Sequence, residues 1–446
     1  MDSSTTSTAV PPDDAGAPVQ VAARTEVSSL RELTPAQWKS GIAAWLGWLF
    51  DGLDMHLYGL IAGPFVASLM LISDSNDPQV KEKMGWIQAA FLVGWALGGG
   101  FFGRIGDLIG RSRALCLTIL AYACFTGFSF FAASWQQLLV FRFIAALGIG
   151  GEWAVGSSLL SETWPRKWAP WIAAVLQTGV NIGVLLACGA SDLLHNYPPK
   201  YVFLVGLVPA LLVLWIRRAV PEPEEWHVAK RASVGNAPRV RELFRGGVRR
   251  TTLLTIVVCA CSLTPWWAFM FWNNQNMRSL AEQAGWTSDV VKSAVPRQFF
   301  LVIFASCIGN FFAGWLAKQF GFRRAIALMC LGFLAAMTAT FYAERDFVSM
   351  LWYIPWVGFF SGVFGLFTMY LPPLFPVLLR TTGAGFSYNI GRLVAAAGTI
   401  FSAQLSIWLD FRHTLLYVGF LFIPAMIVAW FLPDLRADGH AKTSAD

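Results

Sequence analysis

Apolar stretches of about 20 residues recur along the whole chain, and short polar segments separate them. Each stretch is long enough to cross a hydrocarbon core of roughly 30 Å as a helix. A large soluble protein would interrupt such stretches with the spacing of amphipathic helices. The pattern therefore predicts an all-α membrane protein with twelve transmembrane helices, at residues 39–63, 84–103, 112–132, 136–160, 168–190, 201–217, 251–272, 294–316, 324–343, 348–371, 383–408 and 413–432.

Composition and charge agree with a membrane protein and suggest its orientation. Only 13% of the residues are charged, against about 25% in soluble domains, and the mean hydropathy is +0.54. Most Lys and Arg residues fall in segments on the same side of the predicted helices as the N-terminus, and basic residues accumulate on the cytoplasmic side. We therefore expect a multi-pass protein of the cell (inner or plasma) membrane with both termini cytoplasmic. The net charge of +7 then reflects orientation, and we expect no nucleic-acid partner.

The chain divides into two similar halves. Residues 1–37 contain no apolar run, so we expect a flexible cytoplasmic tail without a cleaved signal peptide, and a second tail at 433–446. A charged linker loop at 218–250 separates a six-helix bundle at 38–217 from another at 251–432. The segment from Gly103 to Arg113 resembles the segment from Gly314 to Arg324, with the same spacing between glycines. Repeated halves are typical of secondary transporters, whose substrate site lies near the midplane between the repeats.

Two acids stand in the first apolar stretch. A carboxylate at a bilayer centre costs roughly 2.5–3.5 kcal/mol on insertion scales, so chains keep one there mainly for function. Asp51 and Asp54 share one helix face with Tyr58. Two nearby carboxylates in an apolar setting are coupled, and we expect one of them to carry a proton during transport. A fixed ion pair with an arginine is the alternative.

Other polar residues in the predicted spans suggest an anion site. Arg392 shares a helix face with Asn389 and Tyr388, and its planar guanidinium suits a carboxylate. Arg297 is a second candidate for substrate binding, although it could instead reach water at the outer end of its helix. Candidates for proton coupling or structural pairing are Arg142 and Glu152. Candidates for lining the cavity, or for holding helices together, are Gln177 and Asn181.

Several motifs resemble those of a known superfamily. The segment 103–113 resembles the loop signature of the major facilitator superfamily, and Asp51-Gly-Leu-Asp54 resembles the first-helix motif of its aromatic-acid/proton symporters. The segments 151–165 and 383–392 resemble those of its sialate, lactate and other metabolite/proton symporters. The resemblance implies the major facilitator fold, a coupling role for Arg142, and a cytoplasmic gate at Gly103, Asp107, Gly110 and Arg111. Lys318 departs from the pattern, since an acid is usual there in the second repeat.

Other chemistry has little support in the sequence. The seven cysteines all fall inside predicted spans and form neither a disulfide framework nor a metal-ligand array. There is no phosphate-binding Walker loop. We therefore expect a non-enzymatic, monomeric, proton-coupled symporter of a small organic acid, a carboxylate, that works by alternating access in the lipid bilayer with no cofactor besides the proton. A carrier of a sugar, drug or neutral metabolite is the main alternative, and a non-transporting nutrient sensor is a more remote one.

Overall fold

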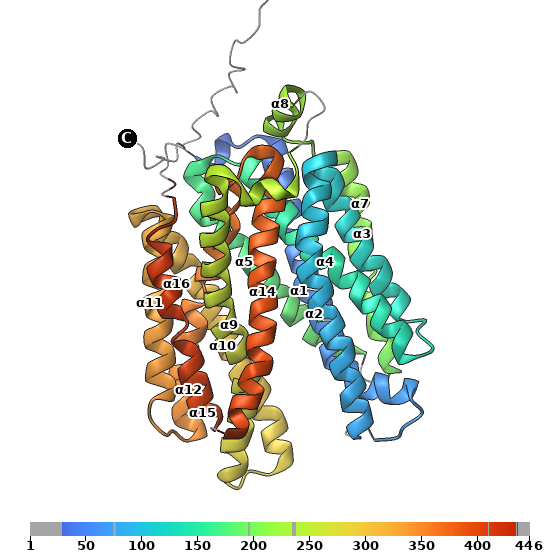
Figure 1. The fold of residues 1–446 in the computed structure, drawn as a ribbon. Helices are drawn as coiled ribbons and strands as arrows, with labels where there is room; N and C mark the ends of the chain where they lie inside the picture. The colour runs from blue at the N-terminus through green and yellow to red at the C-terminus, as the bar shows by residue number, and fades with distance from the viewer. Residues whose placement is uncertain are drawn as a thin grey trace, which may run out of the picture.

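The computed structural model describes residues 29–74, 77–194, 197–233, 238–408, 410–433 and 435, and these ranges contain helices but no strand. Most of the predicted tails at 1–37 and 433–446 lies outside the described residues. The helices run side by side in two groups, one formed by the first half of the chain and one by the second (Figure 1). This arrangement places the face between the two groups deep inside the bundle.

The first half contains α1 (Pro35–Leu69), α2 (Pro78–Ile109), α3 (Arg111–Ser129), α4 (Trp135–Thr163), α5 (Ala169–Leu193), α6 (Val202–Val205) and α7 (Val208–Ala219). The second half contains α9 (Gly246–Gln283), α10 (Ser288–Phe320), α11 (Phe322–Phe341), α12 (Phe347–Phe360), α13 (Val363–Tyr370), α14 (Arg380–Trp408), α15 (Phe411–Gly419) and α16 (Phe422–Ala429). Between the halves, the segment predicted as a loop forms α8 (Glu224–Ala232) and the 3-10 helix η4 (Val240–Phe244).

Three predicted spans are each divided into two helices. The span at 201–217 breaks between α6 and α7, where Pro209 stands in the first turn of α7. The span at 348–371 breaks between α12 and α13, where Gly362 packs against the backbone of Gly309. The span at 413–432 breaks between α15 and α16. Hydrophobic periodicity does not reveal such breaks, because both sides of each break remain apolar.

Ten helical segments of the described residues are long and apolar enough to cross a membrane. The two remaining predicted spans correspond to α1 and α14, which are 35 and 29 residues long. α1 packs along α5, and α14 packs along both α2 and α9. These two helices carry Asp51, Asp54 and Arg392, so the polar residues that suggest function also reduce the apolar character of their helices.

Both ends of the described chain lie at the end of the bundle that holds the α2–α3 turn at Gly110, which we call the gate end. Near the start of α1, the Gln37 side chain donates to the Thr163 carbonyl at the end of α4 (3.1 Å). Near the other end of the chain, the Tyr370 hydroxyl donates to the Pro433 carbonyl (2.6 Å). The turn itself requires glycine, because Gly110 has a φ of 111°.

Candidate functional site

Asp54 forms a buried ion pair with Arg142. A guanidinium nitrogen of Arg142 on α4 lies 3.2 Å from the Asp54 carboxylate on α1, and both side chains are fully buried. Thr126 on α3 donates its hydroxyl to the same carboxylate. The Arg142 guanidinium also lies over the rings of Tyr58 (5.7 Å) and Phe91 (4.9 Å). Asp54 and Tyr58 therefore belong to one tightly held group in the first half.

Asp51 has different surroundings. Its side chain is turned toward Glu152 on α4, and the two carboxylates interact electrostatically. Glu152 is fully buried, and within the described part of the chain neither of its oxygens has a hydrogen-bond partner. The Tyr122 hydroxyl on α3 is close by and likewise lacks a partner there. We call Asp51, Glu152 and Tyr122 the acid cluster.

Close helix packing places Glu152 in this cluster. A Cβ atom added at Gly47 of α1 would lie 1.6 Å from a Glu152 oxygen, so the carboxylate occupies the space that a side chain at position 47 would fill. Gly148 and Gly150 let α4 approach α3 and α2 in the same way. The glycines of α1 and α4 thus bring an acid to the centre of the first half.

Arg392 faces the acid cluster from the second half. The Arg392 guanidinium on α14 interacts electrostatically with Asp51 on α1. It is stacked over the rings of Trp95 on α2 (3.8 Å) and Tyr388 (4.7 Å), and it donates to the Asn389 side-chain oxygen (3.0 Å). Its Nε has no hydrogen-bond partner among the residues that the structure describes. A cation held by its flat faces keeps its N–H edge available for an anion.

Aromatic rings continue this surface into both halves. Tyr388 stacks on Trp153 of α4 with 4.1 Å between ring centroids and an angle of 7°. Trp95 meets Trp267 of α9 edge to face at 5.6 Å. The Arg392 site therefore lies where α2, α4, α9 and α14 meet.

At the gate end, Asp107 of the first half binds the N-terminus of α14 in the second half. Its carboxylate accepts hydrogen bonds from the backbone N–H groups of Thr381 (3.2 Å) and Thr382 (2.9 Å). The first N–H groups of a helix have no partner within the helix, and the helix dipole favours a negative charge there. Asp107 therefore acts as a cap supplied by the other half of the protein.

Arg111 reinforces this closure. Its guanidinium is fully buried, donates two hydrogen bonds to Glu162 (2.9 and 2.8 Å) and lies 3.1 Å from Asp107. It also donates to the Val377 carbonyl of the second half (2.7 Å). Arg380 at the start of α14 lies 3.1 Å from Glu162. The halves are thus joined through charged groups at the gate end.

The gate residues predicted from the sequence occupy this contact. Gly103 approaches the backbone of Thr381 and Thr382, and Gly110 gives the turn its shape. In the second repeat, Gly321 also has a positive φ of 81°, but the Lys318 side chain is exposed. A cation cannot cap a helix N-terminus, so the departure at Lys318 leaves a gate contact of this kind only in the first repeat of the described residues.

The other residues predicted to bind substrate lie outside the Arg392 site, at the interface between the halves or on the exposed surface of α10. Asn181 donates to the Cys307 sulfur across the interface between the halves (3.1 Å). Gln177 lies near Gly365 of α13, which also contacts the buried side chain of Asn310. The Arg297 side chain is exposed near the start of α10, so it does not join the Arg392 site.

Several residues of these groups were not singled out from the sequence. Tyr122, Trp95, Trp153, Glu162, Arg380 and Thr382 all become significant through contacts with other helices. The helical spacing shows which residues of one helix share a face, but it does not show which helix that face meets. Of these residues, Glu162 could most readily have been identified from the sequence, because it is an acid at the end of a predicted span.

Known proteins resemble this chain along most of its length. A family model described as "Sugar (and other) transporter" matches residues 40–250. A probable 4-methylmuconolactone transporter of Cupriavidus pinatubonensis is 28% identical, covering 92% of this chain and 96% of the relative. The sialic acid transporter NanX of Escherichia coli is 25% identical, covering 89% of this chain and 94% of the relative.

A solved structure gives the same fold. The major facilitator superfamily proton:xylose symporter XylE, bound to 6-bromo-6-deoxy-D-glucose, superimposes with a TM-score of 0.73 at 16% identity, covering 90% of this chain and 97% of the other. The predicted all-α major facilitator fold is therefore confirmed. The relatives are named as transporters and not as enzymes. The chain therefore has the major facilitator fold, and across both halves its sequence is similar to proteins named as transporters.

Proposed function

We propose that this protein is a symporter that moves a small organic anion, a carboxylate, together with a proton by alternating access. The observation that carries the proposal is the position of Arg392, which faces the acid cluster from the opposite half of the protein. Two further parts of the proposal are that the protein lies in the cell membrane and that the gate end is cytoplasmic.

The acid cluster supplies a place for the proton. Two adjacent buried carboxylates repel each other in a medium of low dielectric constant when both are ionised. A single proton on Asp51 or Glu152 removes one of the two charges. Asp54 is less suited to this role, because Arg142 and Thr126 already neutralise and bind its carboxylate.

Arg392 links the proton to the substrate. While Asp51 is ionised, it attracts the guanidinium of Arg392. When Asp51 is protonated, that attraction is lost, and the N–H edge of Arg392 is free to bind a carboxylate. Proton and anion then favour each other's binding, as thermodynamic linkage requires.

The named relatives support an organic acid as the substrate. One is named for sialic acid and another for 4-methylmuconolactone. A neutral substrate would leave the positive charge of Arg392 without the carboxylate it interacts with once Asp51 is protonated. Once the substrate is bound, the two halves rock about the site and the contacts of Asp107 and Arg111 open.

Uptake into proteoliposomes with an imposed pH gradient tests the proposal. We expect Asp51→Asn and Glu152→Gln to abolish the stimulation of organic-acid uptake by the gradient while exchange of internal for external substrate continues. We expect Arg392→Gln to weaken substrate binding at least tenfold, because it removes charge-assisted hydrogen bonds worth about 1.5–3 kcal/mol.

Arg297→Gln is the matched control, since it removes an exposed arginine in the same half. It should leave both binding and coupling unchanged. Uptake that ignores the pH gradient in the unaltered protein would exclude proton symport. Equal transport of a sugar or another neutral compound by the unaltered protein and by Arg392→Gln would favour the alternative substrate classes.

A further inference from the structure

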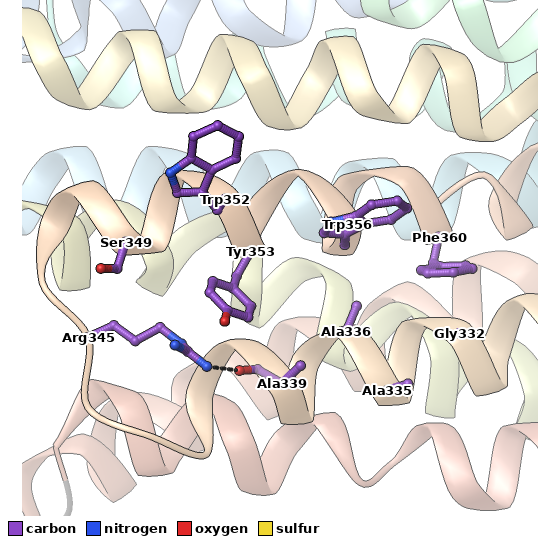
Figure 2. A pocket seen from close by; sticks show the side chains of 10 residues that line it. All are labelled: Gly332, Ala335, Ala336, Ala339, Arg345, Ser349, Trp352, Tyr353, Trp356 and Phe360. Carbon is purple, nitrogen blue, oxygen red and sulfur yellow. Dashed lines mark hydrogen bonds between the residues drawn. The ribbon is translucent and has the colours of Figure 1, made fainter.

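Two adjoining grooves open on the outer face of the second half, between α11 and α12. The first has a volume of about 660 Å³, and Figure 2 shows its residues. Small residues of α11, among them Gly332 and Ala335, form one wall, and aromatic residues of α12, among them Trp356 and Phe360, form the other. The second groove, of about 650 Å³, shares Ala335, Ala339, Arg345 and Tyr353 with the first.

The dimensions and surface of the first groove match one leaflet of a bilayer. From Ser349 to Phe360 the axis of α12 rises about 16 Å, which is close to half of a hydrocarbon core of roughly 30 Å. Trp352 and Trp356 are 77% and 56% exposed. In a transmembrane helix such large exposed rings face lipid. The groove therefore lies along the path of an acyl chain.

Arg345 stands at the polar end of both grooves, opposite the gate end of the bundle. Its guanidinium lies 3.6 Å from the centre of the Tyr353 ring and donates to the Ala339 carbonyl (2.8 Å), as Figure 2 shows for the hydrogen bond. The side chain is half-buried and lines both grooves. The guanidinium is thus held in place and can still donate to a phosphate oxygen.

A carboxylate lies beside this cation. Asp346 follows Arg345 and accepts a hydrogen bond from the Ser349 hydroxyl, which holds the pKa of the Asp346 carboxyl below its usual value. Asp346 therefore carries a negative charge at neutral pH. The nearby Arg412 is already close to Glu344 (3.5 Å) and Asp410 (4.0 Å). Ser349 lines the first groove together with Arg345, so its bond to Asp346 places one negative group near one positive group at the groove mouth, a pair that suits a zwitterion.

We propose that the α11–α12 face binds one phosphatidylethanolamine molecule, with its phosphate on Arg345, its ammonium group near Asp346 and its acyl chains in the two grooves. An anionic headgroup would have no partner for Asp346. A choline headgroup has the same charges, but its quaternary nitrogen has no N–H to donate to the carboxylate.

Native mass spectrometry of the delipidated protein tests this site, with phosphatidylethanolamine, phosphatidylglycerol and phosphatidylcholine of matched acyl chains as probes. We expect one phosphatidylethanolamine to bind more tightly than either other lipid. Arg345→Gln should weaken it about tenfold, because a charge-assisted contact with the phosphate is lost. Asp346→Asn should remove the preference for ethanolamine over choline.

Two variants separate a specific site from general lipid contact. Ala335→Phe fills both grooves from an exposed position and should weaken binding as Arg345→Gln does. Leu328→Phe enlarges another exposed side chain of α11, outside both grooves, and should leave binding unchanged. Equal binding of the three lipids, a preference for phosphatidylglycerol, or wild-type binding by both Arg345→Gln and Ala335→Phe would overturn the proposal.

Discussion

Asp51 and Asp54 are three residues apart on α1, yet they have different partners. A step of three residues leaves them about 60° apart around a helix of 3.6 residues per turn. This difference turns Asp54 toward Arg142 and Asp51 toward Glu152. The sequence could predict that the two acids share a helix side. It could not separate their roles, because these depend on residues of α3 and α4.

Because Asp54 and Asp51 have different partners, replacing each with asparagine should affect the stability of the protein differently. Asp54→Asn leaves the fully buried Arg142 without its counterion, which should destabilise the protein by about 3–5 kcal/mol. Asp51→Asn removes a buried charge that repels Glu152, so it should preserve stability or raise it. Thermal unfolding of both variants in the same detergent measures the contrast. Equal melting temperatures would show that Asp54 and Arg142 are not a stabilising pair.

At the scale of helices, α14 depends on glycines of α2. A Cβ atom added at Gly99 would lie 1.7 Å from the side-chain nitrogen of Asn389, and Asn389 in turn accepts a hydrogen bond from Arg392. The sequence identified Asn389 and Arg392 as neighbours on one helix face. It could not show that α2 fixes their position, because that follows from the crossing of two helices from different halves.

Gly99→Ala should therefore displace Asn389 and disturb the anion site without adding or removing charge. We expect at least a tenfold loss of substrate affinity, about the effect of losing one hydrogen bond to a charged group. Gly100→Ala is a closely matched control, since its added Cβ would have its nearest neighbour at 3.8 Å, an ordinary contact. Substrate titration of both variants by thermal shift measures the effect. A similar loss in the control would mean that α2 tolerates no larger residue at all.

At the scale of the whole molecule, the repeat visible in the sequence is only partly symmetric in structure. Both repeats keep a glycine with positive φ at the turn between their second and third helices. Among the described residues, the first repeat places an acid, Asp107, on a helix N-terminus of the other half, whereas the equivalent position of the second repeat holds the exposed cation Lys318. The sequence revealed this substitution, but its meaning depends on the contact between α2 and α14.

If transport requires the halves to separate at the gate end, a covalent bond between α2 and α14 should stop it. A Cβ atom at Gly106 would lie 3.3 Å from the Thr381 methyl carbon, which suits a disulfide between cysteines at these positions. Oxidation of the Gly106→Cys, Thr381→Cys double variant in proteoliposomes should abolish uptake, and reduction should restore it. Each single variant, treated with the same oxidant, should keep its activity. Full uptake by a completely crosslinked protein would show that α2 and α14 stay together throughout the cycle, and that alternating access uses another path.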